Sequence, residues 1–265
     1  MSHPQGPAIR ADIPHSARIW NFWMGGEDNY EVDRVVGEAC LEIDPDIATM
    51  AVQSRQFLIR AVRHLAGEAG SRQFLDIGTG LPSMQNTHEV AQATAPDSKI
   101  IYVDNDPLVL THAQALLTNT TDEGVTAYID ADFHDPEQIT AHARNVLDFS
   151  QPVTVMFMGV LGHARSHDDM LRIVRTVMDA VPSGSHLVLW DGTTDSQAYV
   201  TLCEEYAKTG GVPYHPRTQA EIRAAFDGFE FVEPGFVPIT EWRSDPTQVG
   251  VDRPLAAYGG VARKP

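Results

Sequence analysis

Cysteine is scarce in this 265-residue chain, in which Cys40 and Cys203 are the only two. They lie far apart and outside any spacing typical of paired metal ligands, which excludes a disulfide scaffold and a zinc ribbon and favours a reducing cytoplasm. The chain also lacks an apolar run of the roughly 18 residues that a membrane helix needs, and its N-terminus lacks the regions of a signal peptide. We therefore expect a soluble cytoplasmic protein without a membrane partner.

Basic residues are also few, because 19 Lys and Arg stand against 36 Asp and Glu and give a formal net charge of -17. Such a charge disfavours nucleic acid as a partner. The chain is 43% hydrophobic, and its length suffices for a large buried core without disulfides or metal ions. These properties are typical of a cytoplasmic enzyme and leave the oligomeric state open.

The first third of the chain has the spacing of apolar residues that is typical of helices. Gly25-Gly26 separates the first two predicted helices, and Asp28 is a candidate cap for the second. Asp44-Pro45 precedes the third and can supply a cap and a first-turn proline. The predicted helices cover residues 16–24, 27–41 and 46–65. We expect residues 1–69 to form a helical cap and residues 70–265 to form a sheet domain.

After residue 70 the period changes, and short apolar runs alternate with helical stretches. The predicted strands cover residues 73–77, 99–103, 125–129, 153–158 and 186–190. The predicted helices cover residues 86–95, 107–117, 136–147, 168–180, 196–208 and 218–226. Apolar strands spaced by helices indicate a parallel sheet covered on both faces. Two last runs, 229–232 and 256–262, have no convincing helix between them and predict an antiparallel pair at a sheet edge.

A glycine turn, Gly78-Thr79-Gly80, follows the first predicted strand. Glycines there let a ligand approach the backbone, and open parallel sheets bind ligands beyond the carboxyl ends of their strands. The next predicted strand ends in Asp104, 24 positions after Gly80 (104 − 80), where a carboxylate can accept hydrogen bonds from both ribose hydroxyls. This order predicts a nucleoside site, and a tight turn with a surface acid is the alternative.

The glycine turn differs from the dinucleotide-binding fingerprint, which has a third glycine at the position where this chain has Ser83. Pro82 also removes an amide donor from the loop that would cradle a pyrophosphate. An acid just before the glycines, Asp76, suits a ligand with an ammonium group. These features favour S-adenosylmethionine over NAD as the cofactor.

The same segments resemble known motifs. The nucleoside-binding motifs of class I S-adenosylmethionine-dependent methyltransferases resemble Asp76-Ile77-Gly78-Thr79-Gly80, Val103-Asp104 and Asp130-Ala131-Asp132-Phe133. A narrower bacterial family of such methyltransferases, with no assigned substrate, is similar over nearly the whole chain. Its most distinctive matches are Gly25-Gly26-Glu27-Asp28-Asn29-Tyr30 and Asn86-Thr87-His88-Glu89.

The resemblance implies an α/β class I methyltransferase (Rossmann-like) fold, with a mostly parallel seven-stranded sheet whose last strand is reversed and an N-terminal helical cap. It also implies S-adenosylmethionine as the cofactor and methyl transfer to an acceptor, which we expect to be a small molecule. A non-catalytic S-adenosylmethionine-binding protein and a nicotinamide-dependent oxidoreductase are the alternatives.

The resemblance also implies roles for several residues. Asp132 would bind the adenine amino group, with Phe133 as an apolar wall, whereas a turn residue and a core residue are the alternative. Asn105 would pack on the adenine, and Gly159 follows the fourth strand near the methyl group. The expected cofactor-binding residues are Asp76, Gly78, Gly80, Asp104, Asn105, Asp132, Phe133, Gly159, Asn29 and Tyr30.

Three side chains are candidates for catalysis. His88 and His163 are potential general bases because the pKa of histidine lies near neutrality, although structural roles are the alternative for both. Tyr30 belongs, with Asn29, to a segment that we expect to close over the site as a lid. We expect no catalytic metal, because Met158 and its neighbour stand where a further acid would be needed.

Overall fold

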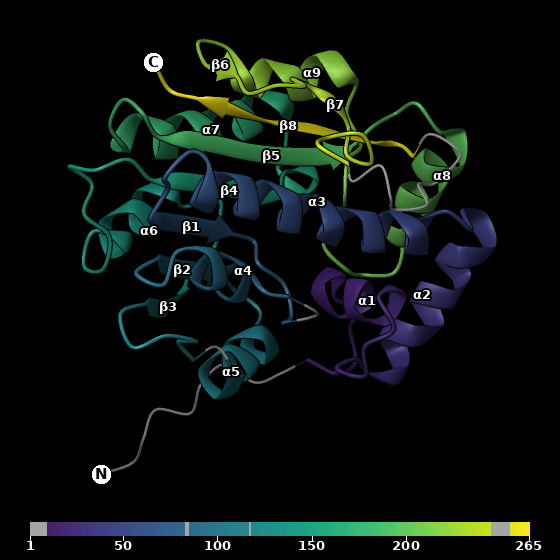
Figure 1. The fold of residues 1–265 in the computed structure, drawn as a ribbon. Coiled ribbons are helices and arrows are strands. Elements are labelled where there is room, and N and C mark those ends of the chain that lie inside the picture. The colour runs from purple at the N-terminus through teal and green to yellow at the C-terminus, as the bar shows by residue number, and fades with distance from the viewer. Residues whose placement is uncertain (1–9, 83–84, 117, 245–254) are drawn as a thin grey trace.

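The computed structural model describes residues 10–82, 85–116, 118–244 and 255–265, in which a mixed sheet runs between two layers of helices (Figure 1). Five parallel strands come first, and two short strands and a long reversed strand follow. The strands are β1 (Gln73–Ile77), β2 (Lys99–Asp104), β3 (Val125–Asp130), β4 (Thr154–Met158), β5 (His186–Gly192), β6 (Glu230–Phe231), β7 (Val237–Pro238) and β8 (Ala257–Arg263).

The order of the strands across the sheet is β3-β2-β1-β4-β5-β8-β6, and β7 also pairs with β8. Strands β1 to β5 are parallel to one another, whereas β8 runs antiparallel to β5 and to β6. The reversed last strand confirms the expected topology. The extra strand beyond the seven expected is β7, which has two residues and is too short for a period to reveal. Because the strand order reverses beside β1, a crevice opens at its carboxyl end.

Alternate residues of the buried strands face opposite helix layers, as the two-residue period requires. On β1, Phe74 packs in one apolar cluster and Leu75 in another. The helices of the first layer are α3 (Ile47–Gly67), α4 (Thr87–Thr94) and α8 (Gln197–Tyr206). Those of the second are α6 (Pro136–Ala143), α7 (His167–Ala180) and α9 (Gln219–Arg223). The sheet is therefore covered on both faces, as the apolar strands predicted.

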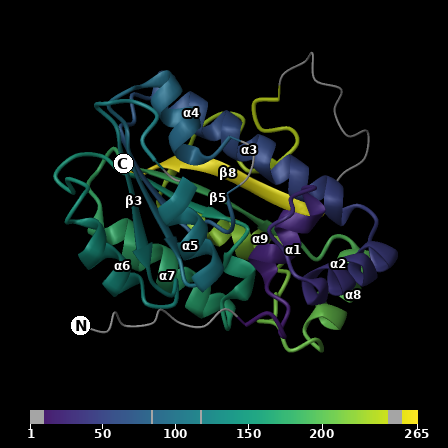
Figure 2. The same ribbon diagram turned by 90° about the horizontal axis from the view of Figure 1, so that it is seen from below.

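Two further helices, α1 (Ser16–Trp23) and α2 (Glu31–Ile43), gather with α8 at the end of the sheet where β1 to β5 terminate (Figures 1 and 2). A buried ion pair joins α1 to α2, because Arg18 Nε lies 3.3 Å from Asp33 Oδ2. Asp33 also accepts a 2.9 Å hydrogen bond from the backbone amide of His15. Since a buried charge without its partner is costly, these contacts fix α1 in place.

The second helix begins at residue 31 instead of 27, which corrects one expectation from the sequence. The side chain of Asn29 donates a 2.9 Å hydrogen bond to the carbonyl of Gly26 and holds a turn before the helix. The amide of Tyr30 then donates to the Asp33 carboxylate at 2.9 Å. Asp33 therefore does the capping that was expected of Asp28.

The third helix begins at residue 47, so Asp44-Pro45 lies in a turn outside it. The Asp44 carboxylate accepts a 3.1 Å hydrogen bond from the amide of Asp46, a local turn that competes with helix formation. Asn86, Asp135 and Ser166 cap the helices that follow them. The Ser83 position of the glycine turn lies outside the described residues. The α-helix between β2 and β3 is α5 (Pro107–Leu116).

Candidate active site

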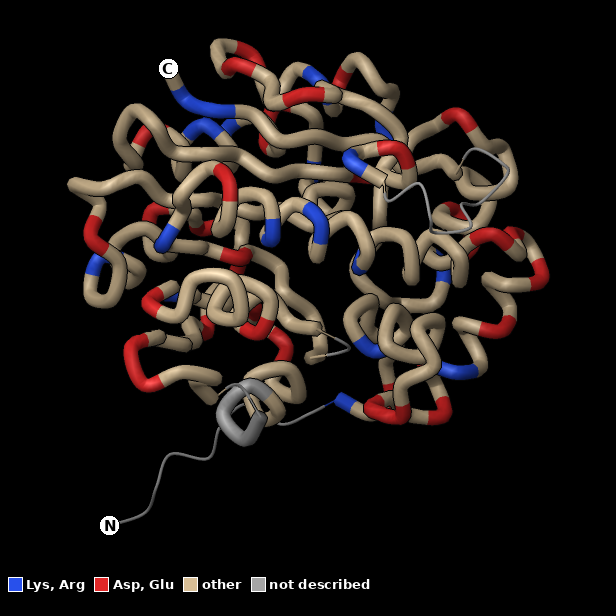
Figure 3. Tube along the Cα trace, in the orientation of Figure 1, with Lys and Arg blue, Asp and Glu red and all other residues tan. Residues whose placement is uncertain are grey.

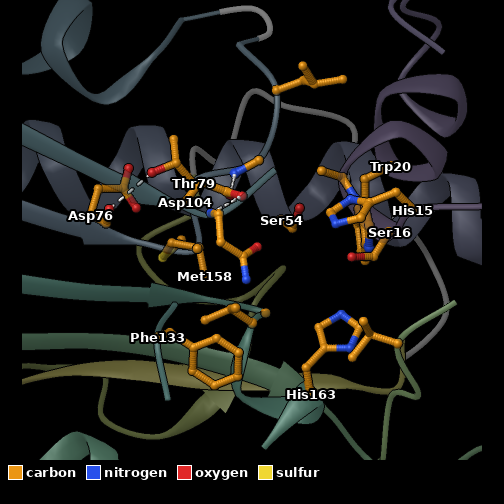
Figure 4. A pocket seen from close by; sticks show the side chains of 18 of the residues that line it. His15, Ser16, Trp20, Ser54, Asp76, Thr79, Asp104, Phe133, Met158 and His163 are labelled. Carbon is orange, nitrogen blue, oxygen red and sulfur yellow. Dashed lines mark hydrogen bonds between the residues drawn. The ribbon is translucent and has the colours of Figure 1, made fainter. Parts of the chain in front are cut away.

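A cavity of about 210 Å³ lies beside the carboxyl ends of β1, β2 and β4. In Figure 4, Asp76 and Asp104 lie on one side and Phe133 and His163 on another, and Ser16 and Trp20 of α1 join them with His15, which caps that helix. Nine residues selected from the sequence line it. They are Asp76, Gly78, Gly80, Asp104, Asn105, Asp132, Phe133, Gly159 and His163. Parallel strands end at one edge of a sheet, which is why loops far apart in sequence meet here.

The two glycines of the turn have different roles. Both have a positive φ, +72° at Gly78 and +67° at Gly80, where L side chains are strained. A Cβ on Gly78 would overlap the side chain of Val160, whereas a Cβ on Gly80 would meet only Ala17, at 3.9 Å. Gly78 is therefore required by the packing of the protein itself, and Gly80 leaves space open toward the cavity.

Asp104 ties the glycine turn to the end of β2. Its carboxylate accepts hydrogen bonds from the amides of Gly80 at 2.8 Å, Asn105 at 2.9 Å and Asp106 at 3.0 Å. A carboxylate has about four acceptor positions, so one remains for a ribose hydroxyl, where the sequence led us to expect two such bonds. Burial raises the pKa of Asp104, and the amides of Asp106 and Gly80 oppose that shift.

Asp76 lies at the inner end of the cavity and is only 2% exposed. Thr87 Oγ1 donates a 2.7 Å hydrogen bond to its carboxylate. Burial raises the pKa of Asp76 to about 6, against the lowering effects of Thr87 and of the charge on Arg55. A carboxylate in this state gains from a cationic ligand, because the ligand replaces the lost hydration.

Arg55 of α3 lines the same cavity and was not selected from the sequence. Burial lowers the pKa of its guanidinium, and the charge of Asp76 opposes this. Among the described residues, no carboxylate forms an ion pair with it. The sequence pattern does point to Arg55, because the residues one helical turn away from it are apolar. These residues, which are all buried, are Ala51, Leu58 and Ile59. A cation on the buried side of an amphipathic helix needs a partner.

At the far end of the cavity, Asn105 is exposed and Phe133 is half-buried. Asp132 is half exposed, and its Oδ1 accepts a 2.9 Å hydrogen bond from the amide of His134. The centroids of the His134 and Phe133 rings lie 4.1 Å apart. This end of the cavity therefore offers an aromatic ring, an amide and a carboxylate to a flat polar ligand.

Beyond β4, Gly159 has a φ of +77°, and a Cβ there would lie 2.5 Å from the Trp190 ring. His163 follows, with Nδ1 at 2.9 Å from the carbonyl of Pro213. A carbonyl only accepts, so the ring proton sits on Nδ1 and the lone pair on Nε2. Burial lowers the pKa of His163 to about 4, although the carbonyls of Pro213 and Val212 act the other way. The ring is therefore neutral near pH 7.

Three selected residues, Asn29, Tyr30 and His88, do not line the cavity. His88 is 2% exposed and packs against β2, where its amide and its Nδ1 lie 2.8 and 2.9 Å from the hydroxyl of Tyr102. Asn29 donates a 3.0 Å hydrogen bond to the side chain of Asn21. Tyr30 packs beside an apolar cluster that contains Leu81. Residues 1–69 do reach the cavity, but through α1 and α3 instead of the segment at residues 25–30.

Within the described ranges, no three His, Cys, Asp or Glu side chains are grouped as they would be around a metal ion. In that same part of the chain, no helix has both the length and the apolar character needed to cross a membrane.

Comparison with known proteins identifies relatives. No curated protein matches the chain. The profile of the S-adenosyl methyltransferase family matches residues 2–265. A DUF574 family protein from Streptomyces avermitilis is 42% identical, with a TM-score of 0.92 over 97% of this chain and 100% of that one. A candidate methyltransferase from Thermobifida fusca is 40% identical, with a TM-score of 0.87 over 96% and 97%.

A more distant structure shares the fold. The S-adenosylmethionine-dependent methyltransferase from Anabaena variabilis is 14% identical, with a TM-score of 0.51 over 100% of this chain and 99% of that one. Nothing in these matches favours either alternative considered from the sequence. The chain therefore belongs to the S-adenosyl methyltransferase family, and it is a methyltransferase whose cofactor is S-adenosylmethionine.

Proposed function

We propose that the cavity binds S-adenosylmethionine with its amino-acid end between Asp76 and Arg55. The observation that carries this proposal is the presence of one buried anion and one cation without an ion-pair partner, among the described residues, in the same cavity. The ammonium group of the ligand would face Asp76 and its carboxylate would face Arg55. Such charge-assisted hydrogen bonds are the strong ones in a partly buried site. Trp190 Nε1, buried and unpartnered among the described residues, is a further donor beside the cavity.

The adenosine end would then lie toward β2 and β3. Asp104 has one acceptor position left for a ribose hydroxyl. Asp132 would accept from the adenine amino group, with Phe133 and Asn105 against the faces of the base. Gly80 supports this placement, because the space above its Cα is open toward the cavity.

The cofactor supplies an electrophilic methyl group on a positively charged sulfur. What the chain must supply is orientation and the exclusion of water, because methyl transfer is an in-line displacement. Trp20 and Ser16 of α1 line the cavity, and Gly159 and His163 line it beyond β4. We assign His163 as the general base of this reaction. We assign His88 and Tyr30 to the packing of α4 and of the cap.

We further propose a small-molecule acceptor and a cytoplasmic location. The cavity is covered by the cap, which suits a small molecule better than a polymer. Along the trace in Figure 3, Asp and Glu are spread through the described chain with Lys and Arg interspersed among them. Together with the net charge of -17, this disfavours nucleic acid as the acceptor. The two free, buried cysteines support a reducing compartment.

Calorimetric titration with S-adenosylmethionine and NAD tests the cofactor site, and we expect binding of the first alone. For the base, His163→Gln should lower the rate of S-adenosylhomocysteine formation by about 100-fold and leave cofactor affinity within about twofold. His142→Gln, on the exposed side of α6, is the matched control. Tight binding of NAD would contradict the proposed site, and an unchanged rate in His163→Gln would remove His163 from the chemistry.

A further inference from the structure

A second hollow lies next to the methyl end of the cavity, and we call it the annex. Ser16, Trp20 and His163 line both the cavity and the annex, so the two meet at these three side chains. The annex extends away from the cofactor residues, toward α8 and Tyr214. A molecule that occupied it would therefore reach the methyl group past His163.

The walls of the annex are aromatic and apolar. Apart from the shared residues, its rings are Trp23, Tyr199, Tyr206 and Tyr214. None of the described residues that line it is Asp, Glu, Lys or Arg. A charged group would lose its hydration there and find no opposite charge among the side chains that line the annex, which costs several kcal/mol. The annex thus selects uncharged chemistry.

The geometry at the junction favours a flat ring. Trp20 and Trp23 meet edge to face with their centroids 5.6 Å apart, and His163 and Tyr214 do so at 5.1 Å. An aromatic ligand would pack favourably against these side chains, because aromatic rings prefer edge-to-face or offset-stacked contacts. The Tyr206 hydroxyl, buried and without a partner among the described residues, adds one polar contact at an otherwise apolar wall.

The annex is small. Its volume is about 40 Å³, well below the roughly 150 Å³ of a cavity known to bind benzene. A whole ring would not enter, but a methyl-sized substituent on that ring would. The ring itself would lie at the junction, between Trp20 and His163.

We propose that the junction and annex form the acceptor site, and that the acceptor is an uncharged phenol-like compound whose small apolar substituent enters the annex while its hydroxyl faces His163 Nε2. This inference rests on the proposed cofactor site. The low basicity of His163 supports an acidic hydroxyl over an alkyl alcohol, because proton transfer to it is less unfavourable from a group with a pKa near 10.

The transfer balances without any further reactant. His163 Nε2 takes the proton of the acceptor hydroxyl, and the acceptor oxygen forms a bond to the methyl carbon. The electron pair of the broken carbon–sulfur bond stays on sulfur, which gives S-adenosylhomocysteine and the methyl ether. The proton then leaves His163 for water when the site opens.

The first experiment measures S-adenosylhomocysteine formation by the wild-type enzyme with four probes. They are 4-methylphenol, 4-hydroxybenzoate, tyramine and 4-methylbenzyl alcohol. We expect 4-methylphenol to have a kcat/KM at least about tenfold above the others, as discrimination by one group in an apolar pocket allows. Equal or better turnover of a charged probe or of the alcohol would overturn the inference.

Failure of this inference is distinguishable from failure of the proposed function. Calorimetry with S-adenosylmethionine is performed on the same preparation. If the cofactor binds and no uncharged phenol is methylated, the acceptor site is wrong and the cofactor site stands. If the cofactor itself does not bind, both proposals fall.

Size-changing variants of α8 locate the acceptor in the annex. Leu202 and Cys203 line the annex and not the main cavity, so neither variant should change cofactor affinity by more than about twofold. Leu202→Ala enlarges the annex and should raise the preference for 4-isopropylphenol over 4-methylphenol by about tenfold. Cys203→Leu fills the annex and should lower that preference by a similar factor.

The matched control is Val200→Ala, on the same helix but outside the annex lining, which should leave the preference unchanged. Thermal unfolding reports whether Cys203→Leu folds, because overpacking a core is destabilising. If it does not fold, the shift in Leu202→Ala decides alone. An unchanged preference in folded variants that bind the cofactor would overturn the annex as the acceptor site.

Discussion

The backbone amide of Gly80 donates a 2.8 Å hydrogen bond to the carboxylate of Asp104. This single contact joins the turn after β1 to the end of β2 at the floor of the cavity. Asp104 therefore has two roles, since it shapes the glycine turn and still offers an acceptor position to the ligand. The two roles make its substitution informative.

Asp104→Ala should lose about 1.5–3 kcal/mol of S-adenosylmethionine affinity, which is the range for one hydrogen bond to a charged group. Calorimetric titration measures this. Asp130→Ala is the control, because Asp130 pairs in register with Asp104 on β3 but does not line the cavity. Equal affinities in a folded Asp104→Ala protein would remove Asp104 from the binding site.

Arg55→Met should weaken the binding of S-adenosylmethionine by about tenfold to 100-fold, because one charge-assisted pair is lost. It should not change the affinity for 5′-methylthioadenosine, which has no carboxylate. Arg63→Met, an exposed cation on the same helix, is the control. A parallel loss for both ligands would mean that Arg55 acts on the fold and not on the carboxylate.

The affinity for S-adenosylmethionine should fall as the pH is lowered from 7 to 5, because the pKa of Asp76 is raised to about 6 and only its anion attracts an ammonium group. The contribution of Asp76 to the stability of the ligand-free protein changes with pH in the opposite direction. A raised pKa means that the contribution of Asp76 to stability is fully present below its unfolded pKa and is lost as the pH rises through about 6.

The rise in Tm on adding the cofactor should therefore grow between pH 5 and pH 7. Asp76→Asn should bind weakly, with little dependence on pH in this range. A wild-type affinity that is constant over the range would contradict the pairing of Asp76 with the ammonium group.

Gly78→Ala and Gly80→Ala should separate stability from binding. In Gly78→Ala the new Cβ overlaps Val160 and the φ is positive, so we expect a loss of about 2–4 kcal/mol in the free energy of unfolding. In Gly80→Ala only the positive φ is strained, at a cost of about 1 kcal/mol. Urea unfolding measures both.

The same pair is then titrated with the cofactor. Gly80→Ala should fold and bind weakly, because its Cβ occupies space above the turn. Adding Val160→Ala to Gly78→Ala should recover part of the lost stability. Normal affinity in Gly80→Ala would mean that the ligand does not lie against this turn.

Trp20→Ala should lower methyl transfer by about tenfold or more, because Trp20 lines the cavity and its removal would admit water. Tyr30→Phe should have nearly normal affinity and turnover. Limited proteolysis near Gly25-Gly26 should slow when S-adenosylmethionine is added. Equal cleavage with and without saturating cofactor would argue that the cap is simply packed and not ordered by the ligand.

The sequence by itself determined the features that depend on neighbours within a few residues. The strand that ends at Ile77, the glycine turn and the acid at Asp104 follow one another along the chain, and Asp76, the glycine turn and Asp104 line one cavity. The caps at Asp135 and Ser166 are equally local, since each side chain binds an amide three residues later. Local features of this kind can be predicted without knowledge of the fold.

The start of α2 differs from the prediction because several polar side chains lie close together before this helix. Two side chains, Asn29 and Asp33, compete with Asp28 for the backbone groups before the helix, and a propensity for capping does not rank such competitors. His88 also looked available near a helix start, but Tyr102, on a strand that follows, occupies both its amide and its Nδ1.

Only the tertiary structure decided which distant segments complete the site. Arg55 lines the cavity from α3, Trp20 lines it from α1, and the carbonyl of Pro213 sets the tautomer of His163 across 50 residues. None of these contacts has a periodic or local signature. They arise because helices pack on the sheet through apolar faces, and the angle of that packing determines which polar side chain at the edge of each face enters the cavity.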